Sequence, residues 1–274
     1  MKEINEKEIK ERIEFYKSQP LKYFDEPKAY RFLLNCIDLT TLEGFDNKKR
    51  IDDLCHKALN YKDEARQIPT TAAVCVYPPF VAQAKSILKG TGVNVAAVAG
   101  AFPAGQSPIE IKVAEVKYTA AQGADEIDMV ISRGKFLEGN YEEVADEIKA
   151  IKAACGTAHL KVILETGDLE TLTNVYKASE IAIEAGADFI KTSTGKIKVN
   201  ATPEYFLTML DALKAHYEKT GKIVGMKPAG GISDADTAIT YLKILENVLG
   251  EPWLTNKNFR IGASRLADRV YERC

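Results

Sequence analysis

The sequence predicts an α/β protein of the (β/α)8 barrel class, a TIM barrel, with an extra helix before the barrel. Short apolar runs rich in Val, Ile, Phe and Ala alternate with amphipathic helical stretches. This alternation is typical of βα units in a parallel sheet. Eight runs, each followed by a helical stretch, match the element count of such a barrel. Barrels of about 250 residues form one domain, so we expect residues 1–274 to be a single domain.

The predicted strands are short apolar runs bounded by polar or turn-forming residues. They cover residues 32–39, 72–77, 94–99, 126–132, 160–166, 189–192, 223–227 and 259–262. The predicted helices cover 48–60, 78–90, 108–122, 140–155, 169–186, 203–219, 234–249 and 264–273. A doubly wound open sheet is the alternative topology. It would be favoured by a glycine-rich dinucleotide-binding turn after the first strand, and the sequence Asp38-Leu39-Thr40-Thr41 is not such a turn.

Residues 1–30 lie outside the alternation and form an N-terminal extension. Ile9, Ile13 and Tyr16 occur at positions i, i+4 and i+7 among Lys and Glu residues, which predicts a charged amphipathic helix. This helix could close the N-terminal end of the barrel, pack on another subunit, or remain a partly solvated addition.

Composition gives no reason to expect nucleic-acid or membrane binding. The net charge is −2, from 37 basic and 39 acidic residues without a long block of one sign. The apolar runs are far shorter than the roughly 18 residues of a membrane span. The N-terminus is charged and lacks the apolar core of a signal peptide. We therefore expect a cytoplasmic protein.

Cysteine and histidine spacing favours neither a disulfide framework nor a metal site. The five cysteines (36, 55, 75, 155 and 274) include no C-x-x-C pair, and the histidines at 56, 159 and 216 are scattered. No metal and no cofactor is predicted.

The active site of a (β/α)8 barrel lies at the C-terminal ends of its strands. Reading each predicted strand to its end gives a set of candidates: Asp38, Thr40, Cys75, Phe102, Asp128, Glu165, Lys191, Lys227 and Ser264. Because side chains alternate between the two faces of a strand, Asp128, Lys191 and Lys227 are expected to converge inside the barrel. Cys75 lies in a strongly apolar strand, so it is either a small core residue or a substrate-lining one.

The two lysines at strand ends indicate amine chemistry. Burial and a second nearby cation both disfavour the ammonium form of lysine. The neutral amine is the form that adds to carbonyl groups to make Schiff bases. These residues do not reveal which lysine is the nucleophile. The purely structural alternative is that both lysines form ion pairs with Glu126 and Glu165.

Small residues follow the seventh and eighth strands, where barrels frequently bind phosphate. Gly230 and Gly231 precede Ser233, and Gly262 precedes Ser264. Such residues let backbone N–H groups approach an anion, which predicts a phosphate site. Ser233 is also a predicted helix N-cap, a structural role that needs no ligand.

Six segments resemble the deoxyribose-phosphate aldolases, which are metal-independent class I aldolases with a (β/α)8 barrel. The resemblance covers residues 35–265, and Lys-Thr-Ser-Thr-Gly followed by Lys-Pro-Ala-Gly-Gly is highly specific. The segments are IDLTTL (37–42), AAVCVYP (72–78), GADEIDMV (123–130), KVILETG (161–167), AGADFIKTSTG (185–195) and KPAGGI (227–232).

The resemblance implies a role for each matching position. Lys191 resembles the Schiff-base nucleophile, Lys227 the cation that lowers its pKa, and Asp128 the proton-transfer carboxylate. The positions that resemble substrate contacts are Lys196, with Asp38 and Thr40 in support, and Gly230, Gly231, Gly262 and Ser264 at the phosphate. Two features depart from the pattern: Arg265 stands where some relatives have a second serine, and the N-terminal extension is longer than in the shortest relatives.

The implied reaction is reversible cleavage of 2-deoxy-D-ribose 5-phosphate to acetaldehyde and D-glyceraldehyde 3-phosphate. The expected partners are therefore a phosphorylated sugar and aldehydes, and we expect a homodimer or homotetramer. Two alternatives remain open. One is a Schiff-base aldolase for another phosphorylated sugar, and the other is a non-catalytic sugar-phosphate-binding barrel.

Overall fold

Eight parallel strands surround a common axis in a computed structural model that describes residues 3–274. Their order in the sheet is β7-β6-β5-β4-β3-β2-β1-β8. Parallel bridges between Met226 and Phe259 and between Ala229 and Gly262 join β7 to the β8 segment and complete the barrel. The strands are β1 Ile37–Thr40, β2 Ala73–Val76, β3 Asn94–Val98, β4 Glu126–Val130, β5 His159–Ile163, β6 Phe189–Lys191, β7 Gly225–Lys227 and β8 Ile261–Ala263. The predicted fold class is confirmed.

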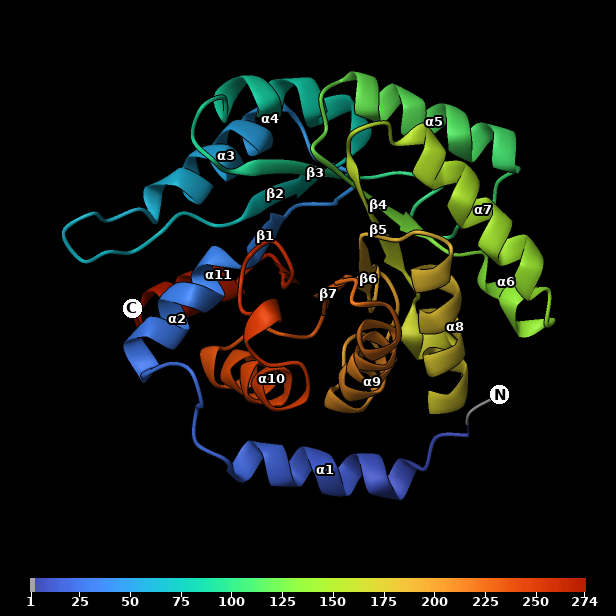
Figure 1. Cartoon of the computed structure of the whole chain (residues 1–274). Helices are drawn as coiled ribbons and strands as arrows, with labels where there is room; N and C mark the ends of the chain where they lie inside the picture. Colours follow the sequence, from blue (N-terminus) through green and yellow to red (C-terminus); the bar gives the residue numbers. More distant parts are fainter. Residues whose placement is uncertain (1–2) are drawn as a thin grey trace.

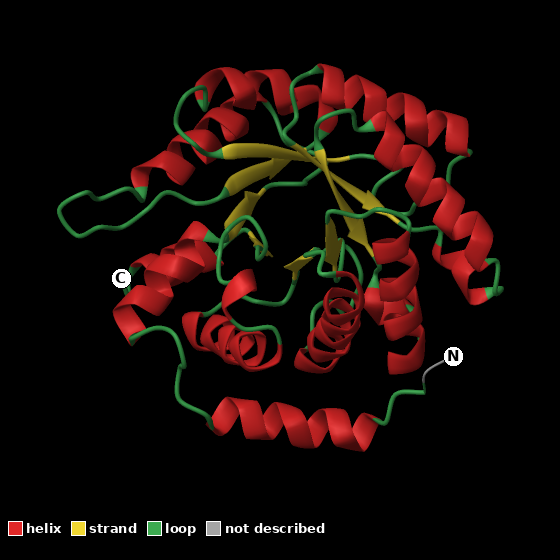
Figure 2. Ribbon diagram, in the orientation of Figure 1, coloured by secondary structure: helices red, strands yellow, loops and turns green. Residues whose placement is uncertain are grey.

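Helices surround the strands on the outside, as Figures 1 and 2 show. The helices between or after the strands are α3 Lys48–Asn60, α4 Val81–Ile87, α5 Ile109–Ala121, α6 Arg133–Leu137, α7 Tyr141–Ala154, α8 Leu172–Glu184, α9 Pro203–Thr220, α10 Ala235–Val248 and α11 Leu266–Tyr271. Short 3-10 turns occur at Pro78–Phe80, Thr166–Asp168 and Glu251–Trp253. Helix α6 and the turns at Thr166–Asp168 and Glu251–Trp253 were not predicted, because each has only a few residues and therefore no apolar period.

The predicted amphipathic helix of the extension is present as α1 (Glu6–Ser18). Its buried residues are Ile9 and Ile13, and it packs on α9 and α10, outside the helix ring (Figure 1). Arg12 fixes the position by donating two hydrogen bonds of 2.7 Å to Asp211 of α9. The extension therefore adds an outer layer to the barrel's own helices, rather than closing the N-terminal end of the strands.

The prediction that residues 32–39 form the first strand was wrong at its start. Residues up to Asn35 belong to helix α2 (Glu26–Asn35), and the strand begins at Ile37. Asp25 caps this helix by accepting a hydrogen bond from the N–H of Lys28, and Pro27 lies in its first turn. These are ordinary helix-start signals. The apolar run crosses a helix end and a strand start, so composition alone could not divide it.

Strand register places chemically different residues on the two faces of the sheet. Ile127 and Met129 of β4 join the core between strands and helices, whereas Asp128 faces the barrel interior. Lys191 of β6 lies in register with Lys227 of β7. The interior also holds a small apolar cluster of Leu42, Cys75, Ala96 and Val98. The barrel interior therefore has an apolar sector and a charged sector.

Candidate active site

Asp128, Lys191 and Lys227 meet inside the barrel, and both lysines bond to the same carboxylate oxygen. Asp128 Oδ2 accepts from Lys191 Nζ at 2.7 Å and from Lys227 Nζ at 2.8 Å. The exposed fractions are 0% for Asp128, 3% for Lys191 and 0% for Lys227. The structure thus brings together the three residues that the strand pattern directed inward, from three different strands.

Below this triad lies a second layer of buried charge. Lys161 of β5 donates to Asp128 Oδ1 at 3.0 Å and also bonds to Glu126. Arg260 bridges Asp38 and Glu126 with 2.7 Å bonds to each. Asp38 in turn pairs with Lys227. Every member of the network is buried, so each charge depends on its partners instead of on water.

The charges of this network balance only if Lys191 is neutral. Its carboxylates come from Asp38, Glu126 and Asp128, and its other cations come from Lys161, Lys227 and Arg260. Three negative charges then face three positive charges. A protonated Lys191 would add an excess positive charge on a side chain that is only 3% exposed, and uncompensated buried charge is unfavourable. The network therefore favours the neutral amine at Lys191.

The pKa shifts distinguish the two lysines in the same way. Burial, assisted by the Lys227 ammonium, lowers the pKa of Lys191 even though Asp128 acts in the opposite direction. Burial also acts to lower the pKa of Lys227, but Asp128 and Asp38 outweigh it and raise that pKa. Lys227 therefore stays protonated, and Lys191 is the lysine that more readily loses its proton and can act as a nucleophile.

Asp128 remains ionised under the same influences. Burial favours its neutral acid, but the charges of Lys161 and Lys227, together with the hydrogen bond from Lys191, hold its pKa well below the ordinary value. A carboxylate is therefore in direct contact with the Lys191 amine, where it can accept a proton or stabilise a cation that forms there.

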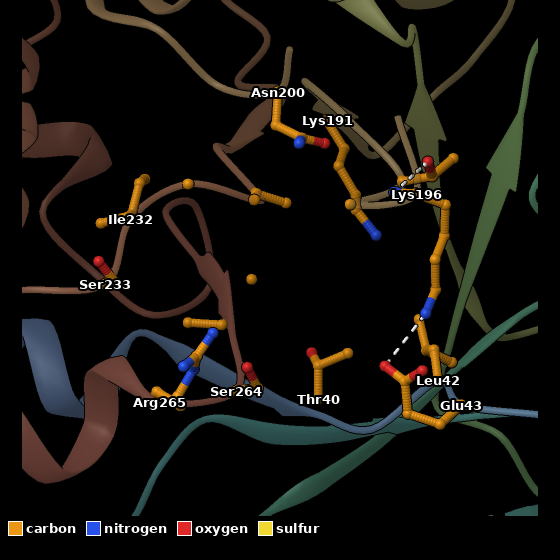
Figure 3. Close-up of a pocket in the computed structure, with 17 residues that line it drawn as sticks. Thr40, Leu42, Glu43, Lys191, Lys196, Asn200, Ile232, Ser233, Ser264 and Arg265 are labelled. Carbon is orange, nitrogen blue, oxygen red and sulfur yellow. Dashed lines mark hydrogen bonds and ion pairs between the residues drawn. The ribbon is translucent and has the colours of Figure 1, made fainter. Parts of the chain in front are cut away.

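A cleft of about 390 Å³ opens above the network, and Lys191 is the member of the triad that lines it. Figure 3 shows the Lys191 side chain directed into the open space. The lining residues are Thr40, Leu42, Glu43, Lys191, Thr194, Gly195, Lys196, Asn200, Ala229, Gly230, Gly231, Ile232, Ser233, Gly262, Ala263, Ser264 and Arg265. A molecule in the cleft can therefore reach the amine of Lys191, while Lys227 is enclosed beneath the surface.

The remaining predicted contacts fall into two groups. Thr40, Lys196, Gly230, Gly231, Gly262 and Ser264 all line the cleft. Asp38 and Cys75 do not line it: Asp38 belongs to the charged network, and Cys75 to the apolar cluster. Burial raises the pKa of the Cys75 thiol, so the thiolate is disfavoured there. Asp38 therefore contacts Lys227 and Arg260 within the network and is not a predicted substrate contact that the cleft exposes.

The sequence and the fold were compared with those of known proteins. A model of the DeoC/LacD aldolase family matches residues 32–242. This chain belongs to the DeoC/LacD aldolase family. It is 49% identical over 247 residues to the deoxyribose-phosphate aldolase of Homo sapiens, covering 85% of this chain and 77% of the human one. A Caenorhabditis elegans protein provisionally named as the same enzyme is 44% identical over 274 residues, covering 97% of this chain and 88% of the other.

Solved structures agree with this membership. A Coccidioides immitis protein, also provisionally named deoxyribose-phosphate aldolase, superposes with a TM-score of 0.74 at 29% identity and covers 99% of each chain. The protein is thus a carbon–carbon lyase with the aldolase barrel. Among residues 3–274, no helix is both long and apolar enough to cross a membrane.

Two glycines at the rim of this aldolase's cleft exclude a larger side chain for different structural reasons. Gly230 has φ +77°, and an added Cβ would lie 2.7 Å from the side chain of Asn200. At Gly262, an added Cβ would lie 2.8 Å from Ala229 Cβ and 3.1 Å from Lys227 Cε. Gly262 therefore makes room for the network below it, in addition to lining the cleft.

The predicted N-cap at Ser233 was wrong by one residue. Asp234 is the cap of α10, and its side chain accepts from the N–H of Thr237 at 2.8 Å. The Ser233 side chain lines the cleft. Serine and aspartate are both good N-cap residues, so the sequence alone could not show which of the two neighbours caps α10.

Glu165 is not a partner of either central lysine. It adopts left-handed backbone angles (φ 56°, ψ 59°), and its buried side chain accepts from the N–H and hydroxyl of Thr194 at 2.9 and 2.5 Å. Arg133 also reaches it at 3.3 Å. Thr194 Oγ1 accepts in turn from the N–H of Lys196 at 3.0 Å. Glu165 therefore organises the loop that follows Lys191, and the structural alternative pairing it with the lysines fails.

Sequence reasoning missed several residues of the site. Lys161 and Arg260 form the second charged layer, while Asn200 and Thr194 line the cleft. A signal existed for Lys161, since it is a charged residue within the apolar run 160–166. Asn200 lies in a loop without periodicity, so no pattern could place it.

Proposed function

We propose that this aldolase cleaves 2-deoxy-D-ribose 5-phosphate reversibly to acetaldehyde and D-glyceraldehyde 3-phosphate through a Schiff base on Lys191. The observation that carries the proposal is the difference between the two lysines. Lys191 reaches the cleft and has a lowered pKa, whereas Lys227 is enclosed and has a raised one. The human and Caenorhabditis elegans relatives support the choice of substrate.

In the first step, the neutral amine of Lys191 adds to the C1 aldehyde, and loss of water gives a protonated imine. This imine accepts the electron pair of the C2–C3 bond when the C3 hydroxyl loses its proton. Glyceraldehyde 3-phosphate leaves and an enamine remains. Protonation at C2 and addition of one water then release acetaldehyde and restore the amine.

Asp128 is the proposed proton-transfer group, with Lys227 or an ordered water completing the relay. Its Oδ2 lies 2.7 Å from the nitrogen that becomes the imine, so the carboxylate also stabilises the imine's positive charge. Positioned acids and bases of this kind contribute roughly 10²–10⁴-fold to the rate. Lys227 keeps the neutral form of Lys191 populated through its own charge, and Asp38 holds Lys227 in place.

Trapping with borohydride tests the nucleophile. The protein is incubated with acetaldehyde and sodium borohydride, digested, and the reduced adduct is located by mass spectrometry. We expect one adduct, on Lys191. An adduct on Lys227 or Lys196 would overturn the assignment, and absence of any adduct would favour a non-catalytic sugar-phosphate-binding barrel.

Donor preference tests the substrate. Turnover of deoxyribose 5-phosphate, coupled to detection of glyceraldehyde 3-phosphate, is the expected activity. Condensation that uses dihydroxyacetone phosphate and rejects acetaldehyde would instead identify an aldolase for another phosphorylated sugar.

We also propose that residues 1–274 work as one domain in a cytoplasmic homodimer or homotetramer. Ile111 and Tyr118, two turns apart on α5, are 59% and 51% exposed, and apolar side chains on one helix face can mark a contact with another subunit. Sedimentation equilibrium tests the assembly, and a monomer at micromolar concentration would contradict it. Cell fractionation tests the location.

A further inference from the structure

Arg265 places an unpaired positive charge in the cleft. Its side chain lines the wall opposite Lys196, beside Ser264 (Figure 3). Within residues 3–274, its guanidinium has neither a hydrogen-bond nor an ion-pair partner. This guanidinium is therefore available to an anion from solution.

The other cations that line the cleft already have partners. Lys196 Nζ lies 3.1 Å from Glu43 Oε1, and Lys191 donates to Asp128. An anion that bound Lys196 would have to replace the Glu43 carboxylate, whereas an anion that bound Arg265 would displace only water. Among the cations of the described chain that line the cleft, Arg265 is therefore the one without a partner.

The surroundings of Arg265 suit a phosphate group. Ser233 and Ser264 line the same cleft. The backbone N–H groups of Gly230 and Gly231 have no hydrogen-bond acceptor in the part of the chain that the structure describes. A guanidinium offers two parallel N–H donors that match two phosphate oxygens, which a serine hydroxyl cannot do.

We propose that Arg265 is the charged ligand of the substrate phosphate and sets this enzyme's preference for phosphorylated over unphosphorylated deoxyribose, an inference that rests on the proposed function. Arg265 follows Ser264 in the lining of the cleft, and the two side chains differ in what they offer an anion. A hydroxyl donates one hydrogen bond, and the guanidinium adds a full charge.

Position 265 can be changed without removing a contact that stabilises the fold. Arg265 is the N-cap residue of α11, but its side chain makes no capping hydrogen bond, and it is exposed. Arg265→Ser therefore introduces a better capping residue while removing the charge. Arg269→Ser is the matched control, since Arg269 is an exposed arginine of α11 that forms an ion pair with Glu272 and does not line the cleft.

The test compares kcat/KM for deoxyribose 5-phosphate and for 2-deoxyribose in the wild type, Arg265→Ser, Arg265→Lys and Arg269→Ser. Arg265→Ser should lose about 10- to 100-fold on the phosphorylated substrate, the range of a charged hydrogen bond, and almost nothing on 2-deoxyribose. Arg265→Lys should be intermediate, and Arg269→Ser should match the wild type. The inhibition constant of inorganic phosphate should rise in parallel in Arg265→Ser.

An unchanged ratio between the two substrates in Arg265→Ser would overturn the inference, as would an equal loss on both. Borohydride trapping with acetaldehyde separates this failure from failure of the proposed function. Acetaldehyde carries no phosphate, so every variant should be trapped at Lys191. Trapping in all variants with an unchanged substrate ratio would reject Arg265 alone, whereas no trapping in the wild type would reject the aldolase mechanism.

Discussion

The barrel interior and the cleft rim of this enzyme differ in how their charged groups are paired and exposed to water. In the interior, carboxylates and cations alternate at hydrogen-bond distance, and each ion is 0–4% exposed. At the rim, small residues leave backbone groups open, and Arg265 has no partner among the described residues. Water screens the rim charge, but it does not reach the interior ions.

This difference separates chemistry from recognition. Buried, fixed charges have strong effects on the pKa of a neighbour, so the interior can tune Lys191. Exposed, unpaired groups can exchange water for a ligand at small cost, so the rim can bind an anion reversibly. Lys191 is at the boundary, because its amine donates to Asp128 of the network and also faces the cleft.

The largest effect is expected from Lys191→Met. Loss of the proposed nucleophile should lower kcat about 10⁴-fold or more and abolish borohydride trapping. Because the interior charges balance without Lys191, urea unfolding should give a free energy close to that of the wild type. A strongly destabilised Lys191→Met protein would contradict the charge balance.

Asp128→Asn should have the next largest effect. Removing the proton-transfer carboxylate should lower kcat by roughly 10²–10⁴-fold. Lys161 and Lys227 would each lose a partner, and breaking a buried ion pair costs about 3–5 kcal/mol of stability. Activity and urea unfolding measure the two effects separately. Normal activity in a folded Asp128→Asn protein would remove Asp128 from the proton relay.

Lys227→Leu should shift the pH dependence of the reaction. The Lys227 ammonium lowers the pKa of Lys191, so its removal should raise that pKa. Activity rises with pH as Lys191 loses its proton, and the rising limb should therefore move to higher pH. The pH profiles of kcat/KM and of trapping rate with acetaldehyde check this. An unchanged profile with weaker substrate binding would show that Lys227 has another role.

The smallest effect is expected at the rim, from Gly230→Ala. The added methyl would clash with Asn200 at 2.7 Å in a left-handed backbone, and we expect KM for the phosphorylated substrate to rise about 10-fold while kcat is kept. Gly139→Ala is the control for backbone strain, because φ there is +85° and no atom lies within 4 Å of the new Cβ. An equal change of KM in Gly230→Ala and Gly139→Ala would exclude a local effect on the cleft.

Much of the fold could be predicted because the βα period is a local property. Each apolar run is short, bounded and followed by a helical stretch, so seven of the strands could be placed to within a few residues. The strand prediction for residues 32–39 failed because an apolar run has the same composition at the end of a helix as at the start of a strand.

The chain itself determined which residues carry the chemistry, since alternation along each strand directs Asp128, Lys191 and Lys227 to the same side. It did not determine how the two lysines differ. That difference depends on Asp38 of β1, Lys161 of β5 and Arg260 immediately before β8, which set the local charge. It also depends on the cleft, which exposes one amine and encloses the other. Electrostatic fields and solvent access are properties of atoms brought together across the barrel, so only the tertiary structure decided the division of roles.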